Sequence, residues 1–350
     1  MKAKKTWLGP VLIAAVFGGT LFLVFREQSP GAVAAALGQV YPGYIALGLA
    51  LMFCFVGWEA LASCLTLRRL GQRAPYVRCL GYSFTGFVFS SITPSSSGGQ
   101  PAQVYEMTRD GIPVAHGALV MLLNAVCYQT ATLVLAVAAL VWHPDFLGEL
   151  GGGLGFLLGT GTAVMVFLTG GMLGFLFAPR PAAWLARHVL GLGARLHLVD
   201  RERAQRRLAR QMEEYRRGAQ CLRRTPSLFP RLLGLSLLQL ISLYLVPGVV
   251  YCAFGLTGRS VAELVAMQAI LSLAVGFLPL PGAVGAFEGA FLRGYALFFG
   301  STLVAPAMLI SRGISFYSFL FIAGGITVAL HLRRRSRAPA KGHPAMERAA

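Results

Sequence analysis

The sequence predicts an all-α, polytopic membrane protein with about six transmembrane helices and two re-entrant helical hairpins in an inverted repeat. Hydrophobic residues make up 56% of its 350 residues and charged residues only 13%, whereas a soluble domain carries about 25% charged residues. Apolar runs long enough to cross a bilayer recur from one end of the chain to the other. Most of the Lys and Arg residues fall between these runs.

The net charge of +18 follows from where those basic residues lie. They concentrate at residues 2–5, 68–78 and 180–231, and from Arg333 onward. All four groups can share one side of the membrane, and the positive-inside rule makes that side the cytoplasm. The basic excess is therefore explained by topology, and it does not indicate a nucleic-acid partner.

Placing the basic segments inside gives the direction of each predicted span and puts both chain termini in the cytoplasm. The first apolar run is expected to be a retained anchor, because it is long for a signal peptide and no small-residue cleavage site follows it. The predicted spans are residues 7–25, 44–67, 117–142, 154–177, 232–254 and 304–331.

Two further apolar stretches, residues 79–110 and 261–300, have flanking charges that place both ends of each on one side of the membrane. Each contains a Pro- and Gly-rich break, at residues 93–101 and 279–285. Irregular backbone at membrane depth persists only when it is buried in protein or lines a wet cavity. We expect two re-entrant hairpins, one from each face. The alternative is a pair of surface loops joining ordinary spans.

The two halves of the chain are weakly similar. When the sequence is aligned with itself at an offset of 188 residues, Gln100 aligns with Glu288 and Asn124 with Arg312. Hairpins entering from opposite faces would make this an inverted repeat, an arrangement that many secondary transporters use to place a site near the midplane. Chance similarity between Gly-rich membrane sequences is the alternative. The expected organisation is one membrane domain (1–335), with repeats at about 42–142 and 231–331, a basic cytoplasmic segment at about 179–230 and a disordered tail at 336–350.

The basic segment contains an amphipathic helix pattern between Arg201 and Arg224. This pattern is typical of a connector packed on the membrane domain, or of a helix lying on the anionic inner leaflet. Its apolar positions recur at four-three spacing: Leu208, Met212, Tyr215, Ala219 and Leu222.

Each Pro/Gly break is followed by residues suited to anion binding. Ser97 stands three residues before Gln100, and Gly285 three residues before Glu288, which is the spacing of a capping box. The second arm of each hairpin would then begin with free N–H groups at membrane depth, where a phosphate can bind. The alternative is a helix-breaking turn whose Ser and Gly residues only satisfy the backbone.

Ionisable residues within apolar segments are expected to face the bundle interior and to pair. Glu59 lies in the second predicted span, Glu288 and Arg293 on the second hairpin, and Arg312 in the last span. Arg312 is expected either to pair with Glu288 or Glu59, or to bind a lipid phosphate through its planar guanidinium.

Other chemistry is poorly supported. The six cysteines are scattered, the histidines form no HExxH motif, and no GxxxxGK[ST] sequence is present. We therefore expect no metal, no cofactor and no ATP coupling within this chain.

Two ordered motifs resemble the lysylphosphatidylglycerol synthase transmembrane family, the flippase-like membrane domain of bacterial multiple peptide resistance factors. The first is residues 92–101, with Tyr105 and Gly111 downstream. The second is residues 279–288, with residues 312–317 downstream. The resemblance extends over roughly residues 5–335. It implies a bacterial plasma-membrane protein, linked to antibiotic resistance, that handles aminoacylated phosphatidylglycerol or another lipid with a phosphate head group.

Two features depart from the family's pattern. Full-length factors carry a cytoplasmic domain that makes the lysyl lipid from lysyl-tRNA. This chain ends shortly after Arg337, so we expect no lysyl transfer by this chain alone. Asn124 stands where many relatives carry arginine, so the first half lacks that charge.

The function expected from these features is translocation of an anionic or aminoacylated phospholipid. One alternative is a phosphatidylglycerol lysyltransferase or glycosyl-lipid enzyme component that acts with a separate soluble subunit. Another is a proton-coupled transporter of a small solute. The expected partners are the phospholipid substrate, anionic inner-leaflet lipids, and a soluble synthase or a second copy of the chain. The candidate substrate-binding residues are Ser97, Gly98, Gly99, Gln100, Tyr105, Gly282, Gly285, Glu288, Arg312 and Tyr317, with Glu59 and Arg293 as candidates for charge pairing.

Overall fold

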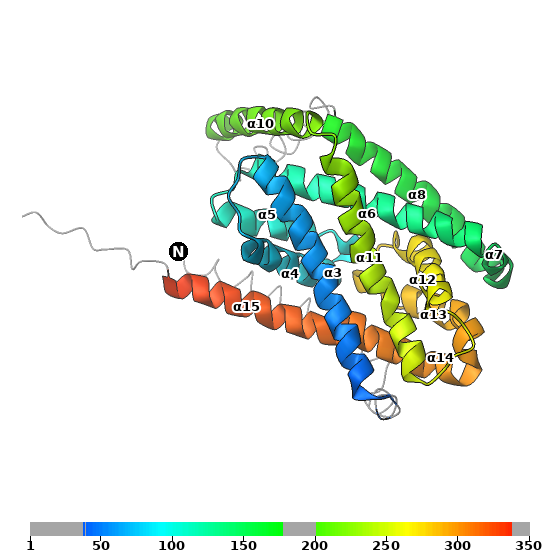
Figure 1. Cartoon of the computed structure of the whole chain (residues 1–350). Helices are drawn as coiled ribbons and strands as arrows, with labels where there is room; N and C mark the ends of the chain where they lie inside the picture. Colours follow the sequence, from blue (N-terminus) through cyan, green and yellow to red (C-terminus); the bar gives the residue numbers. More distant parts are fainter. Residues whose placement is uncertain (1–37, 39, 178–200, 338–350) are drawn as a thin grey trace, which may run out of the picture.

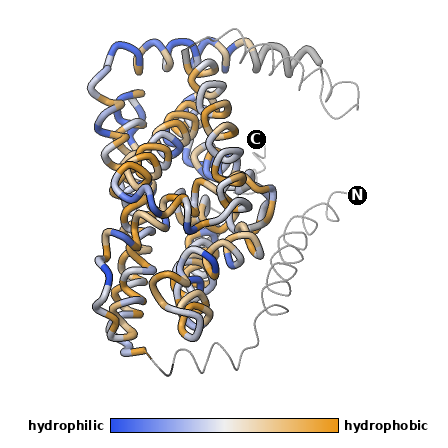
Figure 2. The backbone as a smooth tube through the Cα atoms, turned by 90° about the vertical axis from the view of Figure 1, so that its right-hand side faces the viewer, coloured by the Kyte–Doolittle hydropathy of each residue, from blue (hydrophilic) through white to orange (hydrophobic). Residues whose placement is uncertain are grey.

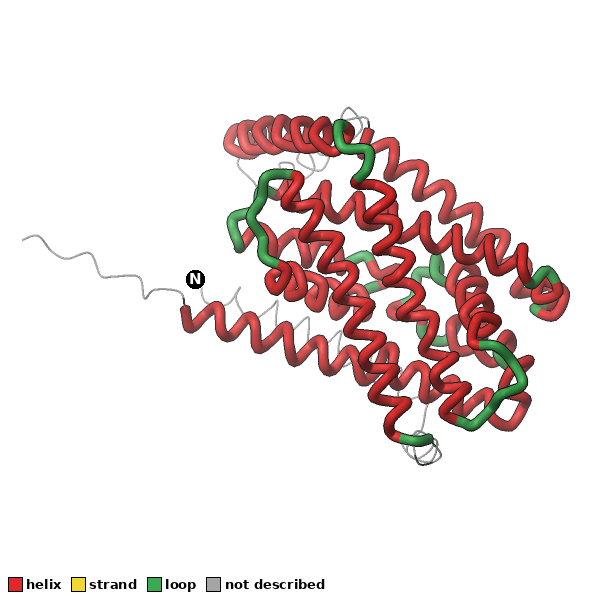
Figure 3. Tube along the Cα trace, in the orientation of Figure 1, coloured by secondary structure: helices red, strands yellow, loops and turns green. Residues whose placement is uncertain are grey.

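The computed structural model describes residues 38, 40–177 and 201–337, and every regular element in that part of the chain is a helix (Figures 1 and 3). Five helical segments are long and apolar enough to cross a membrane. They contain five of the six predicted spans, and the remaining one, residues 7–25, lies outside the described residues. The five are α3 (Pro42–Arg69), α6 (Val114–Trp142), α8 (Gly151–Phe177), α11 (Leu228–Ala253) and the continuous segment Ala296–Arg333.

The last of these segments is not a uniform helix. It is made of α14 (Ala296–Arg312), a π-helical turn (Gly313–Ser318) and most of α15 (Phe319–Arg337). A π-turn inside a longer helix is rare and is frequently found at functional sites. Here the turn directly follows Arg312, the residue singled out from the sequence.

Two pairs of shorter helices occupy the stretches between the long ones. The first hairpin consists of α4 (Tyr76–Ile92), a 3₁₀ turn (Pro94–Ser96) and α5 (Gly99–Arg109). The second consists of α12 (Val261–Val275), a turn (Pro281–Ala283) and α13 (Ala286–Gly294). Their breaks fall where the Pro/Gly-rich segments predict them. The arms have 17, 11, 15 and 9 residues, fewer than the roughly 20 that a membrane crossing needs.

The packing of the hairpins links the two halves of the chain. Helix α4 contacts α15, and α12 contacts α6, so each hairpin packs against a long helix from the other half. The turns of the two hairpins also contact each other. Helices α3 and α11, the first long helices of the two halves, lie side by side and run in opposite directions (Figure 1). The hairpin tips are therefore held together inside the bundle.

Helix α10 (Arg201–Arg223) lies across one end of the bundle (Figure 1) and is mostly hydrophilic, whereas the bundle helices are mostly hydrophobic (Figure 2). Tyr215 and Leu222 of its apolar stripe are buried. The Tyr215 hydroxyl donates to the Phe175 carbonyl at 2.9 Å, and burial raises its pKa. The stripe packs on α6 and α8, as expected for a connector rather than for a helix whose apolar face enters lipid.

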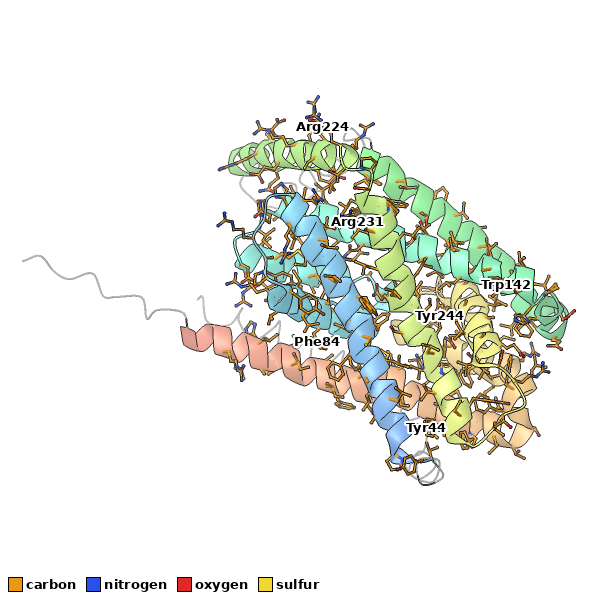
Figure 4. All side chains as sticks on the ribbon, in the orientation of Figure 1. Tyr44, Phe84, Trp142, Arg224, Arg231 and Tyr244 are labelled. Atoms are coloured by element: carbon orange, nitrogen blue, oxygen red, sulfur yellow. The ribbon has the colours of Figure 1, made fainter. Side chains whose placement is uncertain are left out.

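Basic residues gather at the end of the bundle that carries α10. Arg224 and Arg231 lie there, Tyr44 lies at the opposite end, and Tyr244 lies between them (Figure 4). The Cys221 thiol at the end of α10 donates to the carbonyl of Arg69 at the end of α3 (3.3 Å). The ends of α3 and α10 therefore lie at one end of the bundle, as the sequence predicts for these basic segments; residues 178–200 lie outside the described residues.

The core consists of two clusters of buried apolar side chains. The larger one surrounds Tyr244, Ile270 and Phe291, where α11, α12 and α13 meet. The smaller one lies beneath α10 and includes Leu119 and Leu232. A bundle of this kind satisfies most of its backbone polar groups within its helices.

Candidate functional site

The tip of the first hairpin is closed by Thr93. Its hydroxyl donates to the Phe89 carbonyl (2.6 Å) and accepts from the N–H of Gly98 (2.8 Å). The predicted capping box between Ser97 and Gln100 is wrong. Ser97 adopts helical backbone angles after the 3₁₀ turn, whereas an N-cap residue is usually extended. Its hydroxyl instead donates back to the Pro94 carbonyl at 2.8 Å.

The two arms of the first hairpin approach each other closely at glycines. A Cβ atom on Gly99 would lie 2.7 Å from the Gly86 carbonyl oxygen. A Cβ atom on Gly86 would overlap the side chain of Gln103. Gln103 is buried and uses this space to reach α3, where its Nε2 donates to Glu59 Oε1 at 2.7 Å. The glycines therefore allow α5 to present Gln103 to Glu59.

The tip of the second hairpin depends on left-handed backbone, with φ values of 58° at Gly282 and 83° at Gly285. As the spacing predicts, Glu288 bonds back to Gly285: its Oε2 accepts from the Gly285 N–H at 2.6 Å. Its Oε1 accepts from Arg312 Nε at 2.7 Å. One carboxylate therefore caps α13 and also joins it to the last long segment.

Arg312 is the most heavily contacted charged residue of the site. Its Nη2 donates to the Gly282 carbonyl at 2.9 Å. Its guanidinium lies 4.8 Å from the ring centre of Phe287 and 4.6 Å from that of Phe316, and 5.9 Å from that of Tyr317. Arg312 is 6% exposed and Glu288 5%. Of the partners left open by the sequence, the structure gives Glu288 and not Glu59.

Two predicted residues lie away from this centre. Arg293 is exposed on α13, with its guanidinium beside Gly153 at the start of α8, so it does not pair with Glu59. Tyr105 is 62% exposed on α5, with the Arg109 guanidinium 6.0 Å from its ring centre.

A cavity of about 490 Å³ lies between the hairpin tips and the long helices. Gln100 and Glu59 line it from the first half, and Gly282 and Arg312 line it from the second. The other predicted residues lie outside the lining. Those that shape the hairpin tips or contact Arg312 are Ser97, Gly98, Gly99, Gly285, Glu288 and Tyr317. The arrangement can therefore enclose a polar group between the two halves.

The model of the lysylphosphatidylglycerol synthase TM region matches residues 7–324. The chain belongs to this family. The match includes both hairpins and reaches into every long helix, so it confirms the family that the two motifs indicate. It links the chain to the handling of lysylphosphatidylglycerol. A search of curated proteins finds no match.

The cavity of this family member has many polar lining residues that the sequence analysis missed. Gln239 and Gln268 are 5% and 4% exposed within apolar helices. The signal was available, because a polar side chain in an apolar span is expected to face the bundle interior. The missed polar lining residues are Ser90, Ser91, Ser96, Gln103, Tyr128, Gln129, Thr132, Gln239, Tyr244, Gln268, Ser272, Ser311 and Ser315.

Several lining atoms have no hydrogen-bond partner among the described residues. These buried atoms are Gln103 Oε1, Asn124 Oδ1 and Ser311 Oγ. Buried polar groups are almost always bonded to protein or to water, so the cavity suits water or a polar ligand group. Within the described part of the chain, no cluster of His, Cys, Asp and Glu could hold a metal ion.

Proposed function

We propose that this protein is a lipid translocase of the bacterial plasma membrane. Its substrate would be an anionic or aminoacylated phospholipid, such as lysylphosphatidylglycerol, or a related lipid with a phosphate head group. The observation that carries the proposal is the cavity between the two hairpin tips, which polar and charged side chains line in part, inside a bundle of apolar helices. The head group would pass through this cavity while the acyl chains stay in the bilayer.

The same proposal includes a re-entrant inverted repeat. Both hairpins have arms shorter than a membrane crossing, and each packs on a long helix of the other half. Many secondary transporters place a site at the interface of such repeats and expose it to each side in turn. The basic end of the bundle, with α10, would face the cytoplasm, as the positive-inside rule requires.

Arg312 is the residue that we propose for binding the lipid phosphate. Its Nε and Nη2 are held by Glu288 and Gly282, and no described residue accepts a hydrogen bond from its Nη1. Glu288 offsets the cost of burying the guanidinium and fixes its orientation. A phosphate in the cavity would accept from Nη1, and the Gln100 amide of the opposite tip would provide a further donor.

The proposal predicts that neutralising the Arg312–Glu288 pair stops lipid movement. Arg312→Gln and Glu288→Gln in one protein remove both charges together, so no lone buried charge remains to unfold the chain. Proteoliposomes carrying phosphatidylglycerol or lysylphosphatidylglycerol would report movement through the head groups that become accessible at the outer leaflet. We expect transport by the parent protein and none by the double variant.

Arg293→Gln is the matched control, because it removes an exposed arginine from the same hairpin and should transport at the parent rate. Unchanged transport by a correctly folded double variant would contradict the proposed site. If the purified chain made lysylphosphatidylglycerol from lysyl-tRNA and phosphatidylglycerol without moving either lipid, a transferase would replace the translocase as the better account.

A further inference from the structure

The hydrogen-bonding groups of the cavity differ between its two sides. On the second-half side, Arg312 offers a positive charge and the Nη1 donor. On the first-half side, Glu59 offers a carboxylate whose Oε1 accepts from Gln103. No described residue donates to Glu59 Oε2, and no described Lys or Arg forms a salt bridge with this carboxylate.

Gln103 adds a second acceptor on that side. Gln103 turns its amide nitrogen toward Glu59, whose Oε1 accepts the hydrogen bond. Its carbonyl oxygen, Oε1, is then left buried without a donor. Because Gly86 has no side chain, Gln103 can occupy the space beside it in this position. The Glu59 carboxylate and the Gln103 amide oxygen thus lie side by side in the cavity wall. The described residues supply fewer hydrogen-bond donors than these acceptor atoms can use.

Asn124 lies on the same wall. Its Nδ2 donates to Ser63 Oγ at 2.8 Å, and its Oδ1 is buried without a partner. Ser63 is four residues after Glu59 on α3, and residues four apart share a helix face. The neutral side chain of Asn124 therefore lies near the Glu59 carboxylate. The offset of 188 residues aligns Asn124 with Arg312 of the other half.

Surplus acceptors beside a carboxylate without a salt bridge suit a ligand group that donates hydrogen bonds and carries a positive charge. An ammonium group has three N–H donors and no acceptor, and it would give Glu59 the cation that a charge at such depth requires. A phosphate would be repelled by Glu59 and would find no donor at Gln103 Oε1.

We propose that Glu59, positioned by Gln103, binds the amino group of the transported lipid and selects lipids that carry one. The proposal rests on the lipid-translocase function and names a specificity-determining residue for it. The head group would lie across the cavity, with its phosphate toward Arg312 and its ammonium toward Glu59. A lipid with the phosphate alone would use only the Arg312 side.

The test compares transport of lysylphosphatidylglycerol and phosphatidylglycerol in the same proteoliposomes, for the parent and Glu59→Gln. A hydrogen bond to a charged group contributes enough free energy to change a binding ratio by about 10- to 100-fold. We expect the parent to prefer the lysyl lipid by about that factor and Glu59→Gln to lose this preference while it still moves phosphatidylglycerol. Glu59→Asp, which keeps the carboxylate, should retain part of the preference for the lysyl lipid.

Asn124→Arg provides a second variant that leaves Glu59 in place. Its guanidinium would supply an internal cation to the carboxylate and should also abolish the preference. An unchanged preference in Glu59→Gln, or equal loss of both lipids with the melting temperature unaltered, would overturn the proposal. A parent protein that moves both lipids equally would overturn it while leaving the translocase function intact. A parent that moves neither lipid would overturn the function itself.

Discussion

Arg312→Ala is expected to destabilise the protein by about 3–5 kcal/mol, the usual cost of removing one partner from a buried ion pair. Glu288 is 5% exposed and would be left buried without its partner. The Gly282 carbonyl would also lose its bond to Nη2. Because these contacts join α13 and the second hairpin tip to the last long segment, the loss should appear as a lower midpoint of thermal unfolding in detergent micelles.

A double-mutant cycle separates this cost from the general effect of truncation. In the variant that combines Arg312→Ala with Glu288→Ala, no lone charge is buried, so its loss of stability should be smaller than the sum of the two single losses. The coupling free energy between contacting residues is typically 0.5–3 kcal/mol. Strictly additive losses would show that the two side chains do not depend on each other, against the geometry of the pair.

Gly282→Ala is expected to combine a backbone cost with a steric clash at the tip of the second hairpin. At φ 58° a side chain costs about 1–2 kcal/mol. The new Cβ would also overlap the ring of Phe316, and overpacking adds about 1–3 kcal/mol. Since Phe316 stacks on Arg312 at 4.6 Å, displacing the ring should reduce lipid transport as well as stability, measured in the same proteoliposomes and by thermal unfolding.

Gly71, which follows α3, offers the matched control. Its φ is 75°, in the left-handed region like that of Gly282, but a Cβ there would meet no atom within 4 Å. Gly71→Ala should therefore carry only the backbone cost and leave transport intact. If both substitutions had the same effect on transport, the contact between Gly282 and Phe316 would have no part in positioning Arg312.

The long helices and the breaks between hairpin arms could be predicted because their signals are local. Apolar length identifies a span such as α6, and a Pro/Gly cluster identifies a turn such as Pro94–Ser96 wherever it occurs. The bond between Gly285 and Glu288 was also predictable, because the two residues are only three positions apart. The same spacing failed at Ser97, where Thr93 takes the capping role once the 3₁₀ turn changes the backbone direction.

The cavity was less predictable because its contacts join distant parts of the chain. Gln103 and Glu59 are 44 residues apart, and Arg312 and Glu288 are 24 apart. Which pairs form depends on how the hairpins pack between the long helices, and composition does not encode that packing. The buried glutamines, by contrast, could have been assigned to the bundle interior from the sequence alone, because their polar groups are costly to expose to lipid.

The most direct test of the central claim, that the cavity between the hairpin tips binds a lipid head group, is mass spectrometry of lipids that copurify with the protein. Parent protein would be compared with the double variant Arg312→Gln, Glu288→Gln and with the Arg293→Gln control. We predict that one class of phosphate-headed lipid is enriched in the parent and the control and is lost from the double variant. The same lipid profile in all three proteins would contradict the claim.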